Sequence, residues 1–214
     1  GLFPDQGTMV GTAGNGGVMI GAASANDIGN GSAGTIYGIR CERQSGVTIT
    51  GASVRNLTAT SNNSVIGIWL DNSGTGTYTT PVIAGNQVYS LSSTSTSASQ
   101  RVYGIRADNA SLATATVYNN DVYGLTPGAV ASPTSTVVVA GLVANAGTNA
   151  GTVDFSFNSV RIDQTTSANA TSTALYVGGG SATSRDNVLA NTTQGQSGVP
   201  AHYAAYVSTG TITS

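Results

Sequence analysis

The chain has 214 residues, of which 39% are hydrophobic but only 7% are charged, and its formal net charge is −2. All seven basic residues are arginine, so the sequence lacks the clusters of Lys and Arg that nucleic acids and anionic membrane surfaces attract. No apolar run is long enough for a transmembrane helix, and a single cysteine excludes an internal disulfide. These numbers predict one domain with its own core, no nucleic-acid partner and no membrane insertion.

Short strand-like phrases recur along the chain, and no segment shows the spacing of an amphipathic helix. The first set of phrases occupies 35–43, 64–72, 101–109, 137–145, 172–179 and 202–209. Its aligned anchor positions are Gly38, Gly67, Gly104 and Gly141, followed by Leu175 and Ala205 in the last two phrases.

A second set of phrases interleaves with the first, at 48–57, 82–91, 117–125, 155–163 and 183–191. Its anchor residues are Val54, Val88, Val122, Val160 and Val188, and two positions before them stand Ala52, Asn86, Asn120, Asn158 and Asp186. Two phrases that share one elastic period predict stacked coils with variable loops, not a sandwich. We expect Asn86, Asn120 and Asn158 to form a structural ladder at a bend, because Asn tolerates left-handed backbone and can bond to a stacked Asn.

Alternation along the first phrase assigns its faces, since neighbouring residues of a strand point to opposite sides. Tyr37, Ile39 and Cys41 are predicted to point inward, as are Ile66 and Tyr103 in later phrases, while Gly38 and its equivalents point outward. Inward ladders are expected along Ile39, Ile68, Ile105 and Leu142, and on a second wall along Ile49, Ile83, Val117 and Phe155. In the last two phrases the alternation leaves open whether Leu175 and Val177 or Ala174 and Tyr176 are inside.

The best candidate for a functional surface is the outward face of the first phrase. Arg40, Trp69 and Arg106 are expected in one column, and Glu42, Asp71 and Asp108 in the next. An aromatic plane flanked by charged groups suits sugar rings, so these residues are candidate carbohydrate contacts. The alternative is a ladder of ion pairs that only stabilises the surface. Three stacked acids are also a weak candidate for a Ca²⁺ site, because Ca²⁺ takes several oxygen ligands.

A second candidate stripe lies on the second phrase. Tyr89 and Tyr123 occupy matching outward positions between Arg55 and Arg161. This column suits either contact with a sugar or protein, or cation–π stacking that stabilises the wall.

The Asn-x-Val phrases and the coil length, over residues 15–214, resemble the right-handed parallel β-helix repeats of the pectin-lyase-like superfamily. The Ser/Thr/Asn/Gly-rich, lysine-free composition resembles segments of large secreted or surface proteins of Bacteroidota. The resemblance implies an all-β, right-handed parallel β-helix of about six coils over residues 1–214, with 1–14 as an irregular lead-in or end cap. We expect this domain to be a fragment of a longer chain.

The resemblance leaves two functions open. The first is a structural, extracellular or cell-surface solenoid of a bacterial adhesin or filament, which contacts other copies end to end. The second is a polysaccharide-binding or polysaccharide-cleaving module. Lyases of the superfamily use acidic clusters that bind Ca²⁺ with an Arg or Lys base, and hydrolases use paired Asp. Because this chain has no lysine and no local pair of aspartates, we expect no enzyme, no catalytic residue and no metal or cofactor.

Overall fold

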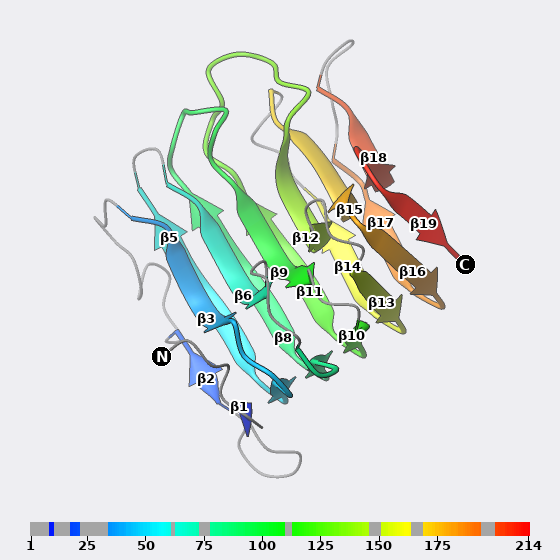
Figure 1. Ribbon diagram of the computed structural model, residues 1–214. Coiled ribbons are helices and arrows are strands. Elements are labelled where there is room, and N and C mark those ends of the chain that lie inside the picture. The colour runs from blue at the N-terminus through cyan, green and yellow to red at the C-terminus, as the bar shows by residue number, and fades with distance from the viewer. Residues whose placement is uncertain are drawn as a thin grey trace.

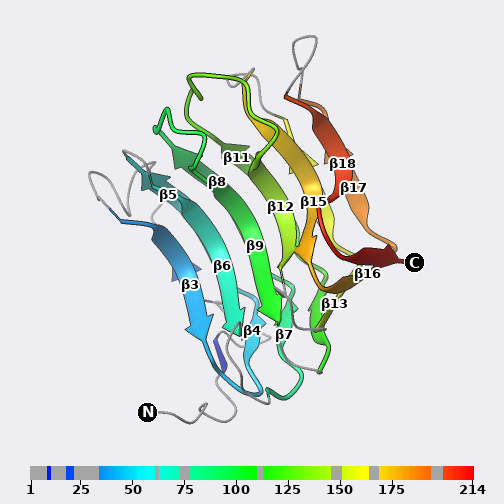
Figure 2. The same ribbon diagram turned by 45° about the horizontal axis from the view of Figure 1, so that its top comes forward.

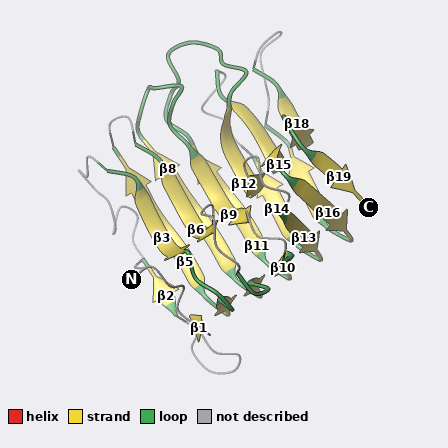
Figure 3. Ribbon diagram, viewed as in Figure 1, coloured by secondary structure: helices red, strands yellow, loops and turns green. Residues whose placement is uncertain are grey.

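The computed structural model describes residues 9–10, 18–21, 34–60, 63–72, 78–109, 113–145, 151–163, 169–193 and 200–214. Within these residues the chain forms nineteen β-strands and no helix (Figures 1 and 3). The strands stack as a solenoid of about five turns, close to the six coils predicted from the sequence.

Each coil contributes one strand to each of three sheets, and every strand pairing is parallel (Figure 2). Sheet 1 contains β1 (Met9–Val10), β4 (Thr48–Thr50), β7 (Val82–Ala84), β10 (Ala115–Tyr118), β13 (Thr152–Ser156), β16 (Ser181–Arg185) and β19 (Thr211–Thr213). Sheet 2 contains β2 (Met19–Ile20), β5 (Ser53–Ala59), β8 (Gln87–Ser93), β11 (Asp121–Thr126), β14 (Ser159–Ile162) and β17 (Val188–Asn191). Sheet 3 contains β3 (Ile36–Glu42), β6 (Val65–Asn72), β9 (Val102–Asn109), β12 (Val137–Asn145), β15 (Thr171–Gly179) and β18 (His202–Val207).

The core consists of columns of apolar side chains that run along the stack. Both predicted ladders are confirmed: Ile39, Ile68, Ile105 and Leu142 are in register, as are Ile49, Ile83, Val117 and Phe155. These residues are buried, and so is Cys41. Burying one such side chain contributes about 2 kcal/mol, whereas a surface ion pair contributes about 0.5 kcal/mol. The apolar columns therefore hold the coils together.

The strands of sheet 3 break the simple alternation at one point in each coil. The register pairs Tyr37 with Ile66 and Ile39 with Ile68 but skips the glycine between them. A Cβ on Gly67 would lie 2.3 Å from Val88 Cγ1 of sheet 2, so the glycine faces the interior next to the inward Ile68. The outward prediction for Gly38, Gly67 and Gly104 is therefore wrong.

The same irregularity moves the residue before each glycine to the outer face. Ile66 and Tyr103 form a separate apolar cluster with Val143, and Tyr37 and Trp69 pack against it. The inward prediction for Tyr37, Ile66 and Tyr103 is wrong for this reason. A regular pleat was assumed, whereas each strand places the glycine and the residue after it on the same side, with the register between strands kept.

The last coils are shifted by one residue from their predicted alignment. Leu142 pairs with Leu175, so Ala174, not Leu175, takes the place of Gly141. Leu175 and Val177 are inside and buried, while Tyr176 packs against the outer cluster. Val160 pairs with Leu189, so the anchor is Leu189, and Val188 is 66% exposed.

A ladder of buried asparagine side chains follows the bend between sheets 1 and 2. The Oδ1 atom of Asn120 accepts from both the backbone N and the Nδ2 of Asn86, at 3.0 and 2.9 Å. Asn120 donates in the same way to Asn158, and Asn158 to Asn187. Asn187 continues the ladder where Asp186 was predicted. The predicted ladder of Asn86, Asn120 and Asn158 is present, and the amides of Asn120 and Asn158 each satisfy backbone groups of the preceding coil.

The left-handed residue of this bend is the one before each ladder asparagine. Positive φ angles occur at Gly51, Gly85, Asn119, Phe157 and Asp186. Of the two reasons expected for the Asn column, tolerance of left-handed backbone is therefore wrong, whereas the bond from each amide to the stacked Asn is confirmed. Of the predicted lead-in, residues 1–14, only Met9 and Val10 are described, and these form β1 beside β4. The rest lies outside the described residues.

Candidate functional site: the outer columns of sheets 2 and 3

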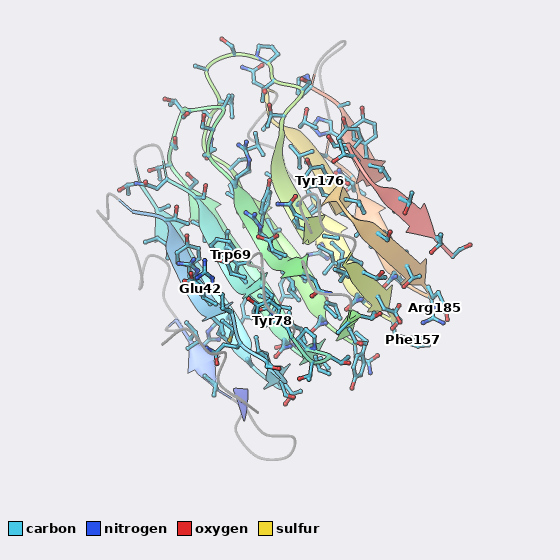
Figure 4. The ribbon with its side chains drawn as sticks, in the orientation of Figure 1. Glu42, Trp69, Tyr78, Phe157, Tyr176 and Arg185 are labelled. Carbon is cyan, nitrogen blue, oxygen red and sulfur yellow. The ribbon has the colours of Figure 1, made fainter. Side chains whose placement is uncertain are left out.

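The three residues of the first predicted column lie in register on adjacent strands of sheet 3. Arg40 of β3 pairs with Trp69 of β6, which pairs with Arg106 of β9. They point outward because Ile39, Ile68 and Ile105, directly before them, point inward. The column predicted from the sequence is therefore present, and Figure 4 shows Trp69 beside Glu42 on these strands.

Trp69 is enclosed by two guanidinium groups. The Cζ atom of Arg40 lies 4.5 Å from the Trp69 ring centroid, and that of Arg106 lies 4.8 Å away. Since β3 and β9 flank β6 on opposite sides, the two cations cover opposite faces of the indole. The Tyr37 ring is a further neighbour, with its centroid 5.2 Å from that of Trp69. Cation–π contacts of this kind contribute about 0.5–2 kcal/mol each.

The acidic column is also in register, from Glu42 through Asp71 to Asp108, and its members bind the first column. Arg40 Nη2 lies 2.6 Å from Asp71 Oδ2 and 3.1 Å from Glu42 Oε2. Arg106 contacts both oxygens of Asp108, through Nε at 2.9 Å and Nη2 at 2.8 Å. Trp69 Nε1 donates to Asp108 Oδ2 at 2.9 Å.

Two of the three acids are shielded from solvent, with Asp71 6% and Asp108 2% exposed. Burial raises the pKa of Asp108 above its ordinary value, and the hydrogen bonds from Arg106 and Trp69 offset part of that effect. The hydrogen bond to Asp71 raises the pKa of Arg40. Alternating columns of opposite charge thus neutralise one another along this face.

The acidic column is the only place where the sequence suggested a cation. Among the described residues, no group of three or more His, Cys, Asp and Glu side chains is arranged to hold a metal ion. The carboxylates of Asp71 and Asp108 are directed at arginine side chains instead.

The second predicted column is present on sheet 2. Arg55, Tyr89, Tyr123 and Arg161 are in register on four successive strands. The two tyrosine rings stack with centroids 5.0 Å apart and planes tilted by 7°. Arg55 and Arg161 lie over the outer faces, with Cζ atoms 6.0 and 5.9 Å from the ring centroids. Arg55 Nη1 donates to the Tyr89 hydroxyl at 2.9 Å, and this bond lowers the pKa of Tyr89.

Sequence reasoning missed a third aromatic group, at the other end of sheet 3. Tyr176 and Tyr206 are in register with ring centroids 6.0 Å apart, and Tyr203 stacks on Tyr206 at 4.9 Å. Figure 4 shows Tyr176 at the far end of the sheet from Trp69. The signal was the shared Ala-x-Tyr-Val pattern at 174–177 and 204–207, which sets the register of both strands.

In the part of the chain that the structure describes, no helix has the length and apolar character of a membrane span. The structure is a parallel β-solenoid, and the resemblance to the pectin-lyase-like superfamily and to proteins of Bacteroidota stays a prediction. No protein-family model, no curated protein and no solved structure matches this chain.

Proposed function

We propose that this chain is a rigid structural segment of a secreted or surface-displayed bacterial protein, such as an adhesin stalk or a filament. It presents fixed columns of side chains on a stiff stack whose successive strands pair backbone to backbone. The composition supports a place outside the cell, because hydroxyl and amide groups replace charge over most of the sequence. End-to-end contact between copies belongs to the same proposal. The proposal assigns no catalytic residue.

One observation carries the structural role over sugar binding. In the candidate stripe of Arg40, Trp69 and Arg106, the groups that could bind a sugar already contact neighbouring protein side chains. Guanidinium groups cover both faces of the Trp69 indole, and its N–H is bonded to Asp108. A sugar ring would have to displace an arginine that also pairs with a shielded carboxylate, and that ion pair would be lost. A surface built in this way favours register and stiffness.

The test compares glycan binding with stability. Wild-type protein is applied to an array of bacterial, plant and algal polysaccharides, with Trp69→Ala and Trp69→Phe as variants. The structural role predicts no binding to any polysaccharide and a loss of unfolding free energy of about 2–4 kcal/mol for Trp69→Ala. Trp69→Phe retains a ring between the arginines and loses less. A measurable affinity that disappears in Trp69→Ala, with folding intact, would overturn the proposal.

A second candidate function, polysaccharide binding, is favoured by the stack of Tyr176, Tyr206 and Tyr203. No cation covers these rings in the described structure, and Tyr203 is 37% exposed. Binding that is abolished by Tyr203→Ala and unchanged by Tyr118→Ala would support it. Release of unsaturated sugars in the presence of Ca²⁺ would establish cleavage and contradict both the structural role and simple binding.

A further inference from the structure

Two tyrosines of adjacent coils lie ring against ring in the middle of sheet 2. Tyr89 is on β8 and Tyr123 on β11, the two central strands of this six-stranded sheet. The ring centroids lie 5.0 Å apart and the ring planes are tilted by 7°, so the two phenols lie face to face, and rotation of the side chains brings ring positions ortho to the oxygens together. Both rings are on the outer face and half-buried, so they are accessible to a small oxidant.

From this geometry we propose that Tyr89 and Tyr123 form an oxidative cross-linking site, where a one-electron oxidant of the peroxidase and hydrogen peroxide class joins the two rings as dityrosine. Each phenol gives up one electron and one proton, leaving two tyrosyl radicals. The radicals couple through a carbon–carbon bond between ring positions ortho to the oxygens. The two ring hydrogens then move to the oxygens, which restores both phenols. One hydrogen peroxide accepts the two electrons and two protons and becomes two waters.

The flanking residues favour the first step at this pair. Arg55 donates to the Tyr89 oxygen at 2.9 Å and so stabilises the phenolate, which is more easily oxidised than the phenol. The lowered pKa of Tyr89 agrees with this bond, while burial raises the pKa of Tyr123. Arg55 covers the outer face of the Tyr89 ring, and Arg161 covers the outer face of the Tyr123 ring. The remaining face of each ring is turned toward the other tyrosine, which is therefore the coupling partner within reach.

The product would join two coils covalently across 34 residues of chain. The chain has one cysteine and can form no internal disulfide. The dityrosine bond would therefore provide the covalent link between coils that a disulfide cannot provide in this chain. The chemistry needs only the geometry of two rings, so it is independent of the structural role proposed above.

The test treats the folded 214-residue chain, in dilute solution, with peroxidase and hydrogen peroxide, followed by digestion with trypsin. Trypsin cleaves after arginine, so Tyr89 lies in peptide 56–101 and Tyr123 in peptide 107–161. The expected product is these two peptides joined with loss of two hydrogen atoms, together with dityrosine fluorescence and a higher thermal midpoint. Tyr89→Phe and Tyr123→Phe should each abolish this joined species.

Tyr78→Phe and Tyr118→Phe are the matched controls, because they remove the other tyrosine of each peptide and should leave the product unchanged. A circular dichroism spectrum and melting curve of each variant establish that it folds. The proposal is overturned if folded wild-type protein is oxidised only at the Tyr176, Tyr203 and Tyr206 group, or only between separate chains. It is also overturned if the joined species survives in folded Tyr123→Phe.

Discussion

The side-chain oxygen of Asn120 accepts two hydrogen bonds from Asn86, one from the backbone N–H and one from the amide Nδ2, and all of these groups are buried. Asn120 Nδ2 in turn donates to Ile83 O at 3.0 Å and to Asn158 Oδ1 at 2.9 Å. One side chain therefore satisfies polar groups of the two flanking coils, in a place where water does not replace them.

Replacement of Asn120 by Ala should lower the unfolding free energy by about 3 kcal/mol or more, because it leaves several buried polar groups without partners. Urea denaturation followed by circular dichroism measures the loss. Asn187→Ala is the control, since its bonds to Asn158 are only partly buried and water can replace them. Equal losses in the two variants would show that burial of the ladder is unimportant.

Gly67→Ala should destabilise the solenoid by about 3 kcal/mol or more, because the new Cβ would lie 2.3 Å from Val88 Cγ1 and 2.7 Å from Gly104 O. Gly85→Ala is the matched control. Its Cβ would meet nothing within 4 Å, and only its φ of +63° opposes the substitution. We expect a loss of about 1 kcal/mol for Gly85→Ala. A tolerated Gly67→Ala, measured by thermal unfolding, would contradict the inward placement of this glycine.

Phe157→Asn should stabilise the protein by about 1 kcal/mol, because Phe157 has a φ of 55° where the equivalent residues are Gly, Asn and Asp. The ring is 60% exposed, so little burial is lost, and Figure 4 shows it at the edge of the molecule near Arg185. Phe157→Ala removes the ring but keeps an unfavourable side chain at positive φ, and should bring no gain. A less stable Phe157→Asn would mean that the ring makes a stabilising contact.

Stability should fall as the pH rises from about 10 to about 12, because burial raises the pKa of Tyr103 to about 12 from its ordinary value of 10. The folded state keeps the phenolic proton over this range while the unfolded state releases it, so stability present below pH 10 is lost above it. The loss for this group is about 3 kcal/mol.

Because the chain has no lysine, no lysine side chain titrates in this alkaline range and adds to the pH dependence of stability. Urea denaturation of wild type and Tyr103→Phe at a series of pH values isolates the contribution. The pH dependence of the variant should be shallower. Parallel curves for the two proteins would assign the alkaline loss to other groups.

The sequence was sufficient for the stacked architecture because the repeated phrases place like residues one above another. Gly38, Gly67 and Gly104 predicted the register of β3, β6 and β9, and with it the columns of Arg40, Trp69 and Arg106. The faces of these strands could not be predicted in full. Strict alternation fails where each strand places the glycine and the residue after it inside, and no residue type marks that position except the glycine itself.

The last coils were misaligned because Ala174 replaces the glycine and Leu189 the valine, so both anchors changed together. These two substitutions fall at facing positions of sheets 3 and 2, where Gly141 meets Val160 in the coil before. The spacing of the repeats predicted which residues lie in each candidate column. It could not predict the hydrogen bonds between the columns, because these depend on side-chain rotamers and burial.

Each strand of the three sheets is bonded only to the strands of the coils immediately before and after it. Length is therefore a modular property of this molecule. Duplicating one internal coil would add one inter-strand step of about 4.8 Å and create no new type of junction. Genes encoding such chains can grow or shrink by whole repeats, and the reach of the encoded rod would change in equal increments.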